Sequence, residues 1–312
     1  MQAVHAVLTR PAEVTAMASR EAWWARHSDV TREATRPIDA AILAGFAADR
    51  LGYAFASGYQ AALRALVPDL PADRVASICI TERGGAHPRA METRLAADGE
   101  GRLRLSGHKR WATLGDEAGV LLVAAVEGVD DQGRNRLRIA RIEASRAGVK
   151  LRPMPEPPFT PEIVHEEIDL DGVLVEAGDL LAGDGFTRYV RPFRTIEDLH
   201  VQAAIYAYLI REIRAHDLPR SLAERFAALL TTLVALAAAE PSAAEVHVAL
   251  AGVLSLARGP LDELGRAWVG SESPAQARWE RDRPLLSVAG KARELRLERA
   301  WEALAQARSG PR

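Results

Sequence analysis

The hydrophobic period of the chain changes twice, and this constrains the fold more than any other feature of the sequence. In the first part, apolar side chains such as Tyr59 and Leu63 recur three or four positions apart, as along one face of a helix. From about Val75 to Asp184 the period becomes two, and glycines separate short apolar runs as turns separate strands. Helix-forming segments return after Arg194. We therefore expect an α+β fold with a β domain between two helical parts.

Prolines predict where the C-terminal helices end. Breaks before Pro219, Pro241 and Pro260 would separate the first four helices after the β region, because proline disfavours a helix interior. Between the first two breaks, apolar residues such as Phe226 and Leu230 form a wide stripe. A helical bundle is the expected arrangement.

Composition indicates an ordinary globular protein and excludes several classes of function. Of the 312 residues, 48% are hydrophobic and 26% charged, and 40 basic residues balance 42 acidic ones, so no net field favours nucleic acid or an anionic membrane. The single cysteine, Cys79, cannot form an internal disulfide, and no signal-peptide pattern begins the sequence, so we expect a cytoplasmic protein. The eight histidines, including His165 in His-Glu-Glu, lack the spacing of metal ligands, and no metal site is expected.

Two short blocks in the β region carry the strongest functional signal. The first, residues 78–87, reads I-C-I-T-E-R-G-G-A-H, and the second, residues 107–113, reads G-H-K-R-W-A-T. Together they resemble the paired flavin-binding loops of the acyl-CoA dehydrogenase family, which run as hydrophobic-T-E-P-G-A-G-S-D and G-x-K-x-W-I-T. Residues 168–175 resemble the strand that closes the family's middle domain, and residues 183–186 resemble its exit loop. The sequence is thus similar to a shortened, divergent acyl-CoA dehydrogenase.

This resemblance implies a domain order, a cofactor and partners. The expected parts are an N-terminal helical part (1–75), a central β-barrel-like domain with the flavin-binding loops (76–186) and a C-terminal helical bundle (187–312). The implied reaction is the FAD-dependent α,β-desaturation of an acyl-CoA thioester, with an electron-transferring flavoprotein as electron acceptor. A homo- or hetero-oligomer is also expected.

The resemblance assigns flavin contacts within the two blocks. A flavin ring is flat and apolar on its faces but polar along one edge, so its site needs a stacking surface and hydrogen-bond donors. Trp111 would cover one face, Thr113 would donate near N5, and Thr81 would meet the pyrimidine edge of the ring. Small residues at 84–86 would let the main chain approach the phosphates. The expected cofactor contacts are Ile78, Ile80, Thr81, Gly85, Ala86, Trp111, Ala112 and Thr113.

Alternatives remain open for the most distinctive of these residues. Trp111 could instead be a core residue of the β domain, and Thr113 a turn former. His87 replaces the family's serine, and Pro88 its aspartate. His87 would bind substrate by donating a hydrogen bond and attracting phosphate. It is equally interpretable as an exposed loop histidine.

The catalytic base is the main departure from the family pattern. Counted from Arg281, the position of the usual glutamate falls at Gly290, which can remove no proton. Some family members place the base on the first helix after the β domain, where this chain has Asp198 and, one residue earlier, Glu197. Alternatively, these two acids and Thr195 are a capped helix start.

The segments that bind the distal half of FAD in the family are missing as well. Neither the R-x-x-F-G helix nor the F-G-G-x-G segment is recognisable in the C-terminal part. The alternative function is therefore a non-catalytic subunit that keeps the fold and pairs with an active paralogue.

Overall fold

The computed structural model describes residues 1–13, 15–269 and 274–308. They form two compact units. The helical unit comprises the described residues within Met1–Ala65, Pro158–Glu162 and Thr195–Arg312, and the sheet unit comprises Leu66–Pro157 and Ile163–Arg194. Among the helices of the described residues, none has the length and apolar character that crossing a membrane requires.

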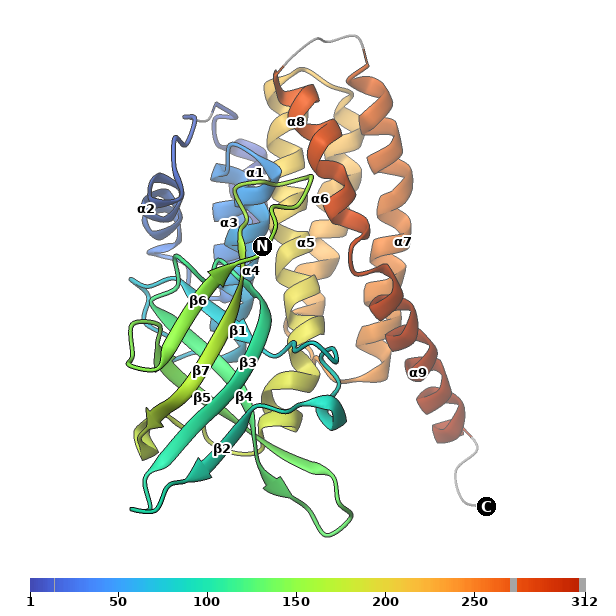
Figure 1. Ribbon diagram of the computed structural model, residues 1–312. Helices are drawn as coiled ribbons and strands as arrows, with labels where there is room; N and C mark the ends of the chain where they lie inside the picture. Colours follow the sequence, from blue (N-terminus) through green and yellow to red (C-terminus); the bar gives the residue numbers. More distant parts are fainter. Residues whose placement is uncertain (14, 270–273, 309–312) are drawn as a thin grey trace. The chain divides into compact units, whose positions relative to one another are not determined.

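The helical unit draws its helices from both ends of the chain (Figure 1). The N-terminal helices are α1 (Gln2–Thr9), α2 (Arg20–Thr31), α3 (Pro37–Ala47) and α4 (Leu51–Leu66). The C-terminal helices are α5 (Arg191–Ala215), α6 (Arg220–Leu236), α7 (Ala244–Ala267), α8 (Pro274–Asp282) and α9 (Gly290–Arg308).

Close backbone contacts place α5 against α3 and α4 within this unit. A Cβ atom on Gly45 of α3 would lie 2.2 Å from the carbonyl oxygen of Ala204, and one on Gly58 of α4 would lie 2.6 Å from the Cα of Val201. Glycine is required at both contacts because the helix backbones leave no room for a side chain. The middle of α5 is buried almost all round, as expected for a helix at the centre of a bundle.

One predicted helix boundary is wrong. Pro260 does not separate two helices but lies inside α7, which continues to Ala267. A proline inside a helix removes one backbone hydrogen bond. Pro260 is buried, so its ring gains apolar contacts in the interior that offset this loss. Burial thus outweighs the local preference.

The sheet unit contains a curled sheet of seven strands (Figure 1). The strands are β1 (Ala76–Cys79), β2 (Arg94–Ala97), β3 (Leu103–Thr113), β4 (Val120–Val129), β5 (Asn135–Glu143), β6 (Val149–Pro153) and β7 (His165–Val175). Their order is β1-β4-β2-β3-β7-β6, with β5 paired to β4. The predicted α+β fold, with helical parts before and after a β domain, is confirmed.

The core of the sheet unit explains the alternation in the sequence. Leu105 of β3, Ile142 of β5 and Ile168 of β7 are buried in one cluster, while neighbours along each strand are more exposed. In β4, by contrast, residues 120–126 are all buried. This continuous apolar run therefore forms a strand covered on both faces.

Candidate functional site

The two sequence blocks are adjacent in the sheet unit. The first block leaves β1 and reaches Thr81, whose carbonyl oxygen accepts a hydrogen bond from the backbone N–H of Arg110 in β3 at 2.8 Å. Ile78 and Ile80 are buried, with exposed fractions of 6% and 9%, and anchor this segment. Residues about 30 positions apart in the sequence thus form one surface.

A tight turn follows Thr81. The backbone N–H of Glu82 donates to the carbonyl oxygen of Gly85 at 3.0 Å. The backbone N–H of Gly85 donates to the carbonyl oxygen of Glu82 at 2.9 Å. Gly85 has a φ of 100°, which favours glycine. Gly84 at the tip is exposed, and Ala86 is half-buried. The turn therefore presents main chain that a ligand can approach closely.

A buried ion pair fixes the base of this turn. The Lys109 ammonium, fully buried in β3, lies 2.6 Å from the Glu82 carboxylate, whose exposed fraction is 6%. The same carboxylate accepts the backbone N–H groups of Glu92 at 2.7 Å and Thr93 at 3.1 Å. Burial alone would raise the pKa of Glu82, but the ammonium and the hydrogen bonds outweigh it and hold that pKa below its ordinary value.

Trp111 sits on an irregularity of β3. The pairing of β3 with β7 shifts register between Lys109 and Ala112, and Trp111 has a φ of 61°. A bulky residue in the left-handed region is strained, and such strain concentrates at functional sites. The bulge leaves 52% of Trp111 exposed, whereas Ala112 is fully buried. The interpretation of Trp111 as a core residue is therefore wrong.

His165 on β7 contacts this surface and was not expected there. Its Nδ1 lies 3.3 Å from the Thr113 hydroxyl, and its ring packs edge-on to Trp111 at a centroid distance of 5.5 Å. Burial lowers the pKa of His165, so the ring is neutral near pH 7 and can share a hydrogen bond with Thr113. Sequence reasoning considered His165 only as a poor metal ligand. Its role depends on a β3–β7 register that local patterns do not reveal.

His87 lies at the far end of the first block. Its Nδ1 accepts the backbone N–H of Arg89 at 3.2 Å, so a neutral ring carries its proton on Nε2, where it can donate outward. The side chain is exposed. Arg89 also lines a cavity of about 250 Å³ with the β4–β5 turn, residues 132–135.

The candidate bases Glu197 and Asp198 belong to the helical unit. The Asp198 carboxylate accepts Arg293 at 3.1 and 2.7 Å and Arg296 at 2.5 Å, both from α9. Glu197 is half-buried. Because α5 already begins at Arg191, the alternative interpretation as a capped helix start is wrong.

Gly290 is the first residue of α9. A Cβ atom there would meet nothing within 4 Å, so this position could carry a side chain. Across residues 1–13, 15–269 and 274–308, no group of three or more His, Cys, Asp or Glu side chains is placed to hold a metal ion.

The comparisons with known proteins agree with this geometry. Residues 77–173 match the family model of the acyl-CoA dehydrogenase middle domain. Among solved structures, butyryl-CoA dehydrogenase from Megasphaera elsdenii is similar with a TM-score of 0.69 at 14% identity, over 98% of this chain and 94% of that chain. The chain has an acyl-CoA dehydrogenase-like fold.

Two further structures show the same fold at low identity. Glutaryl-CoA dehydrogenase from Mycobacterium smegmatis in complex with FADH2 has a TM-score of 0.65 at 16% identity, covering 96% of this chain and 92% of that chain. A structure described as the electron transferring flavoprotein of Acidaminococcus fermentans has a TM-score of 0.69 at 14% identity, covering 91% and 90%. No match was found among curated protein sequences.

Proposed function

We propose that the chain is an acyl-CoA dehydrogenase-like flavoprotein whose sheet unit binds the isoalloxazine ring of FAD against Trp111. The observation that carries this proposal is the exposed indole of Trp111 on a strained backbone, in the same two blocks as Thr113 and the glycine turn, within the residues that match the acyl-CoA dehydrogenase middle domain. Without a ligand, exposing this aromatic face to water is unfavourable, and the positive φ of Trp111 adds backbone strain.

The remaining residues of the surface fit the ring and its phosphates. Thr113 would donate near N5 of the ring, with His165 holding the orientation of its hydroxyl at 3.3 Å. Thr81 and the backbone at Ile78 and Ile80 would meet the pyrimidine edge of the ring, and the turn at Gly85 would admit phosphate. Ala112, expected as a cofactor contact, is fully buried in the core of the sheet unit, so its side chain does not reach the surface proposed for the ring.

The proposed reaction is the α,β-desaturation of an acyl-CoA thioester. Bound FAD would supply the hydride acceptor. His87 would donate from Nε2 to the substrate, and a carboxylate of α5 would remove the α-proton. Of the two candidates, Asp198 is already held in ion pairs by Arg293 and Arg296, so Glu197 is the candidate to test first. An electron-transferring flavoprotein would then accept the electrons.

The second candidate function is a non-catalytic subunit that pairs with an active paralogue. Two observations favour it: Gly290 carries no side chain where the family pattern expects glutamate, and Asp198 is engaged by Arg293 and Arg296. In this case the chain would keep the flavin surface and lack the base.

Flavin binding is tested first. Purified protein is reconstituted with FAD, and affinity is measured from the quenching of flavin fluorescence. Trp111→Ala should weaken FAD binding about tenfold or more, because it removes the stacking surface. The matched control is Trp301→Ala on α9, where the indole is 56% exposed but lies outside the sheet unit. Equal affinities in both variants and the parent would refute the flavin proposal.

Catalysis is tested by anaerobic flavin reduction with a panel of acyl-CoA substrates. If Glu197 is the base, Glu197→Gln should slow reduction about 10²-fold or more. If the parent protein binds FAD but no acyl-CoA reduces it, the non-catalytic function is correct. Gly290→Glu should then introduce measurable reduction, because the family resemblance expects the glutamate at this position and a side chain has room there.

A further inference from the structure

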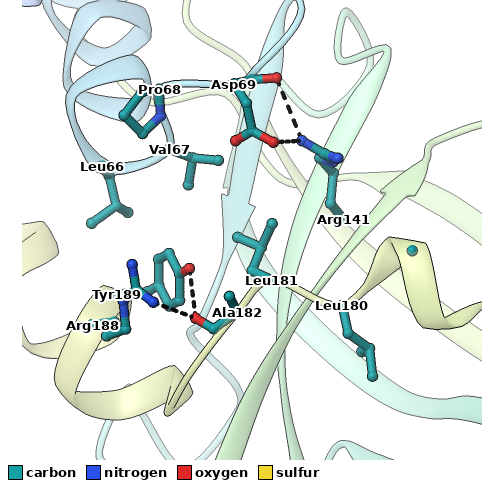
Figure 2. A pocket seen from close by; sticks show the side chains of 11 residues that line it. Leu66, Val67, Pro68, Asp69, Arg141, Leu180, Leu181, Ala182, Arg188 and Tyr189 are labelled. Atoms are coloured by element: carbon teal, nitrogen blue, oxygen red, sulfur yellow. Dashed lines mark hydrogen bonds and ion pairs between the residues drawn. The ribbon is translucent and has the colours of Figure 1, made fainter.

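A second cavity in the sheet unit lies apart from the residues assigned to the flavin. It has a volume of about 370 Å³, within the range of pockets that hold small molecules. Its walls come from the end of α4, from Arg141 of β5, and from the segment after β7 that includes Leu181 and Tyr189 (Figure 2). None of the expected flavin contacts lines it.

One wall is a helical turn of unusual geometry. Residues Phe186–Val190 form a π-helix, and its residues Arg188 and Tyr189 face the cavity. Single π-turns are rare and occur frequently at functional sites. The turn is also tightly specified. A Cβ atom on Gly183, whose φ is 86°, would lie 2.5 Å from the Cδ of Arg188, so glycine makes room for this arginine.

Hydrogen bonds fix the two side chains of this wall. Arg188 Nη1 donates to the carbonyl oxygen of Ala182 at 3.1 Å, and the Tyr189 hydroxyl donates to the same oxygen at 3.0 Å (Figure 2). In the part of the chain that the structure describes, no carboxylate is recorded within ion-pair distance of Arg188. Its guanidinium therefore keeps donors available beside the cavity.

The opposite wall carries a second cation that is neutralised. Arg141 donates to the carboxylate of Asp69 at 2.7 Å, and Asp69 is 69% exposed at the rim. Counting Arg141, Arg188 and Asp69, the lining has a net charge of +1. Between the charged groups, Val67 and Leu181 provide buried apolar surface. The cavity thus combines one uncompensated positive charge with an apolar side.

We propose that this cavity binds a small monocarboxylate with a short apolar chain, with Arg188 as its principal contact. A monoanion matches the net charge of the lining, whereas a phosphate dianion would exceed it. The planar guanidinium suits a carboxylate, and the apolar wall suits a chain of a few carbons. The volume limits the ligand to a body far smaller than a coenzyme A thioester. The site is therefore independent of the flavin surface and of the proposed reaction.

The experiment is calorimetric titration of the full chain with sodium butanoate, without added flavin. Butan-1-ol and butylamine are the uncharged and cationic controls, and inorganic phosphate tests the anion class. Saturable binding of butanoate in the millimolar range is expected, with weaker binding of all three comparison compounds. Failure of butanoate to saturate, or tighter binding of butan-1-ol or phosphate, would overturn the proposal.

Variants locate the site. Arg188→Gln should weaken butanoate binding about tenfold or more, because it removes the charged donor. Arg191→Gln, which removes the same charge from an exposed position just beyond the π-helix, should leave binding unchanged. Asp69→Asn should strengthen binding by about two- to fivefold, since it frees Arg141 from an exposed ion pair. A misfolded variant cannot produce this gain. Equal affinities across the three variants would refute the assignment.

Discussion

The buried ion pair between Glu82 and Lys109 provides a direct test of how the candidate site is held together. Lys109→Met keeps most of the side-chain volume but removes the ammonium that lies 2.6 Å from the Glu82 carboxylate. That carboxylate has an exposed fraction of 6% and cannot turn to water, so the substitution leaves a buried charge with only the N–H groups of Glu92 and Thr93. Breaking a buried pair in this way costs about 3–5 kcal/mol of unfolding free energy.

The double variant isolates the interaction energy between Glu82 and Lys109 from the contacts that each side chain makes with its surroundings. In Glu82→Gln/Lys109→Met both charges of the pair are removed, so we expect it to be less destabilised than the sum of its single variants by about 2 kcal/mol or more. Unfolding free energies are measured by urea denaturation. Arg134→Met, which breaks the exposed pair with Asp130, is the control and should cost about 0–1 kcal/mol. Additive single variants, or a Lys109→Met cost no larger than the control, would refute the reasoning.

The same pair predicts a pH dependence with a definite sign. The pKa of Glu82 is lowered in the folded protein, so the stabilisation is present above the carboxyl's unfolded pKa of about 4.3 and is lost as pH falls through the folded value. The cost of Lys109→Met should therefore shrink in acid, where Glu82 can protonate. A cost that is constant between neutral pH and acid would contradict this account.

Three further predictions concern the core. Gly45→Ala should destabilise the protein by about 3 kcal/mol in thermal or urea unfolding, because its Cβ would lie 2.2 Å from the Ala204 carbonyl oxygen; an unchanged midpoint would be inconsistent with this contact. Cys79 is fully buried, which raises its thiol pKa to about 12, so it should react with a thiol reagent only after denaturation. Burial lowers the pKa of His27 to about 3 and of His200 to about 4, so both fold as neutral rings, and unfolding free energy should fall as pH drops below about 6.5. His200→Gln should reduce that pH dependence.

Local patterns in the sequence were sufficient for the order of elements, whereas the expected flavin contacts came from the family resemblance of the two blocks. The change from a helical period to a period of two depends on neighbours within a few residues, which is why the boundary near Val75 and the buried strand at residues 120–126 could be predicted. The turn at Gly85 likewise follows from residues within four positions of each other. Such features need no knowledge of the tertiary structure.

Features that depend on strand register or on distant helices could not be predicted. The contact of His165 with Thr113 joins residues 52 positions apart and requires both the β3–β7 register and its bulge. The exposure of Trp111 also depends on the bulge, because regular alternation from buried Lys109 would turn residue 111 toward the core. Pro260 shows the reverse case, in which burial in α7 overrides a strong local signal.

The surroundings of Asp198 show that the ion-pair partners of a carboxylate can come from a distant part of the sequence. Its two partners, Arg293 and Arg296, come from positions 95 and 98 residues later, so the sequence near Asp198 still reads as that of a possible base. A carboxylate that acts as a base needs an oxygen free to meet the substrate proton, and both oxygens of Asp198 accept hydrogen bonds from guanidinium groups. Two arginines against one carboxylate instead form a positively charged link between α5 and α9. The proposed flavin contacts belong to the sheet unit and include neither Asp198 nor Glu197, so flavin binding should survive changes at these two carboxylates that abolish catalysis.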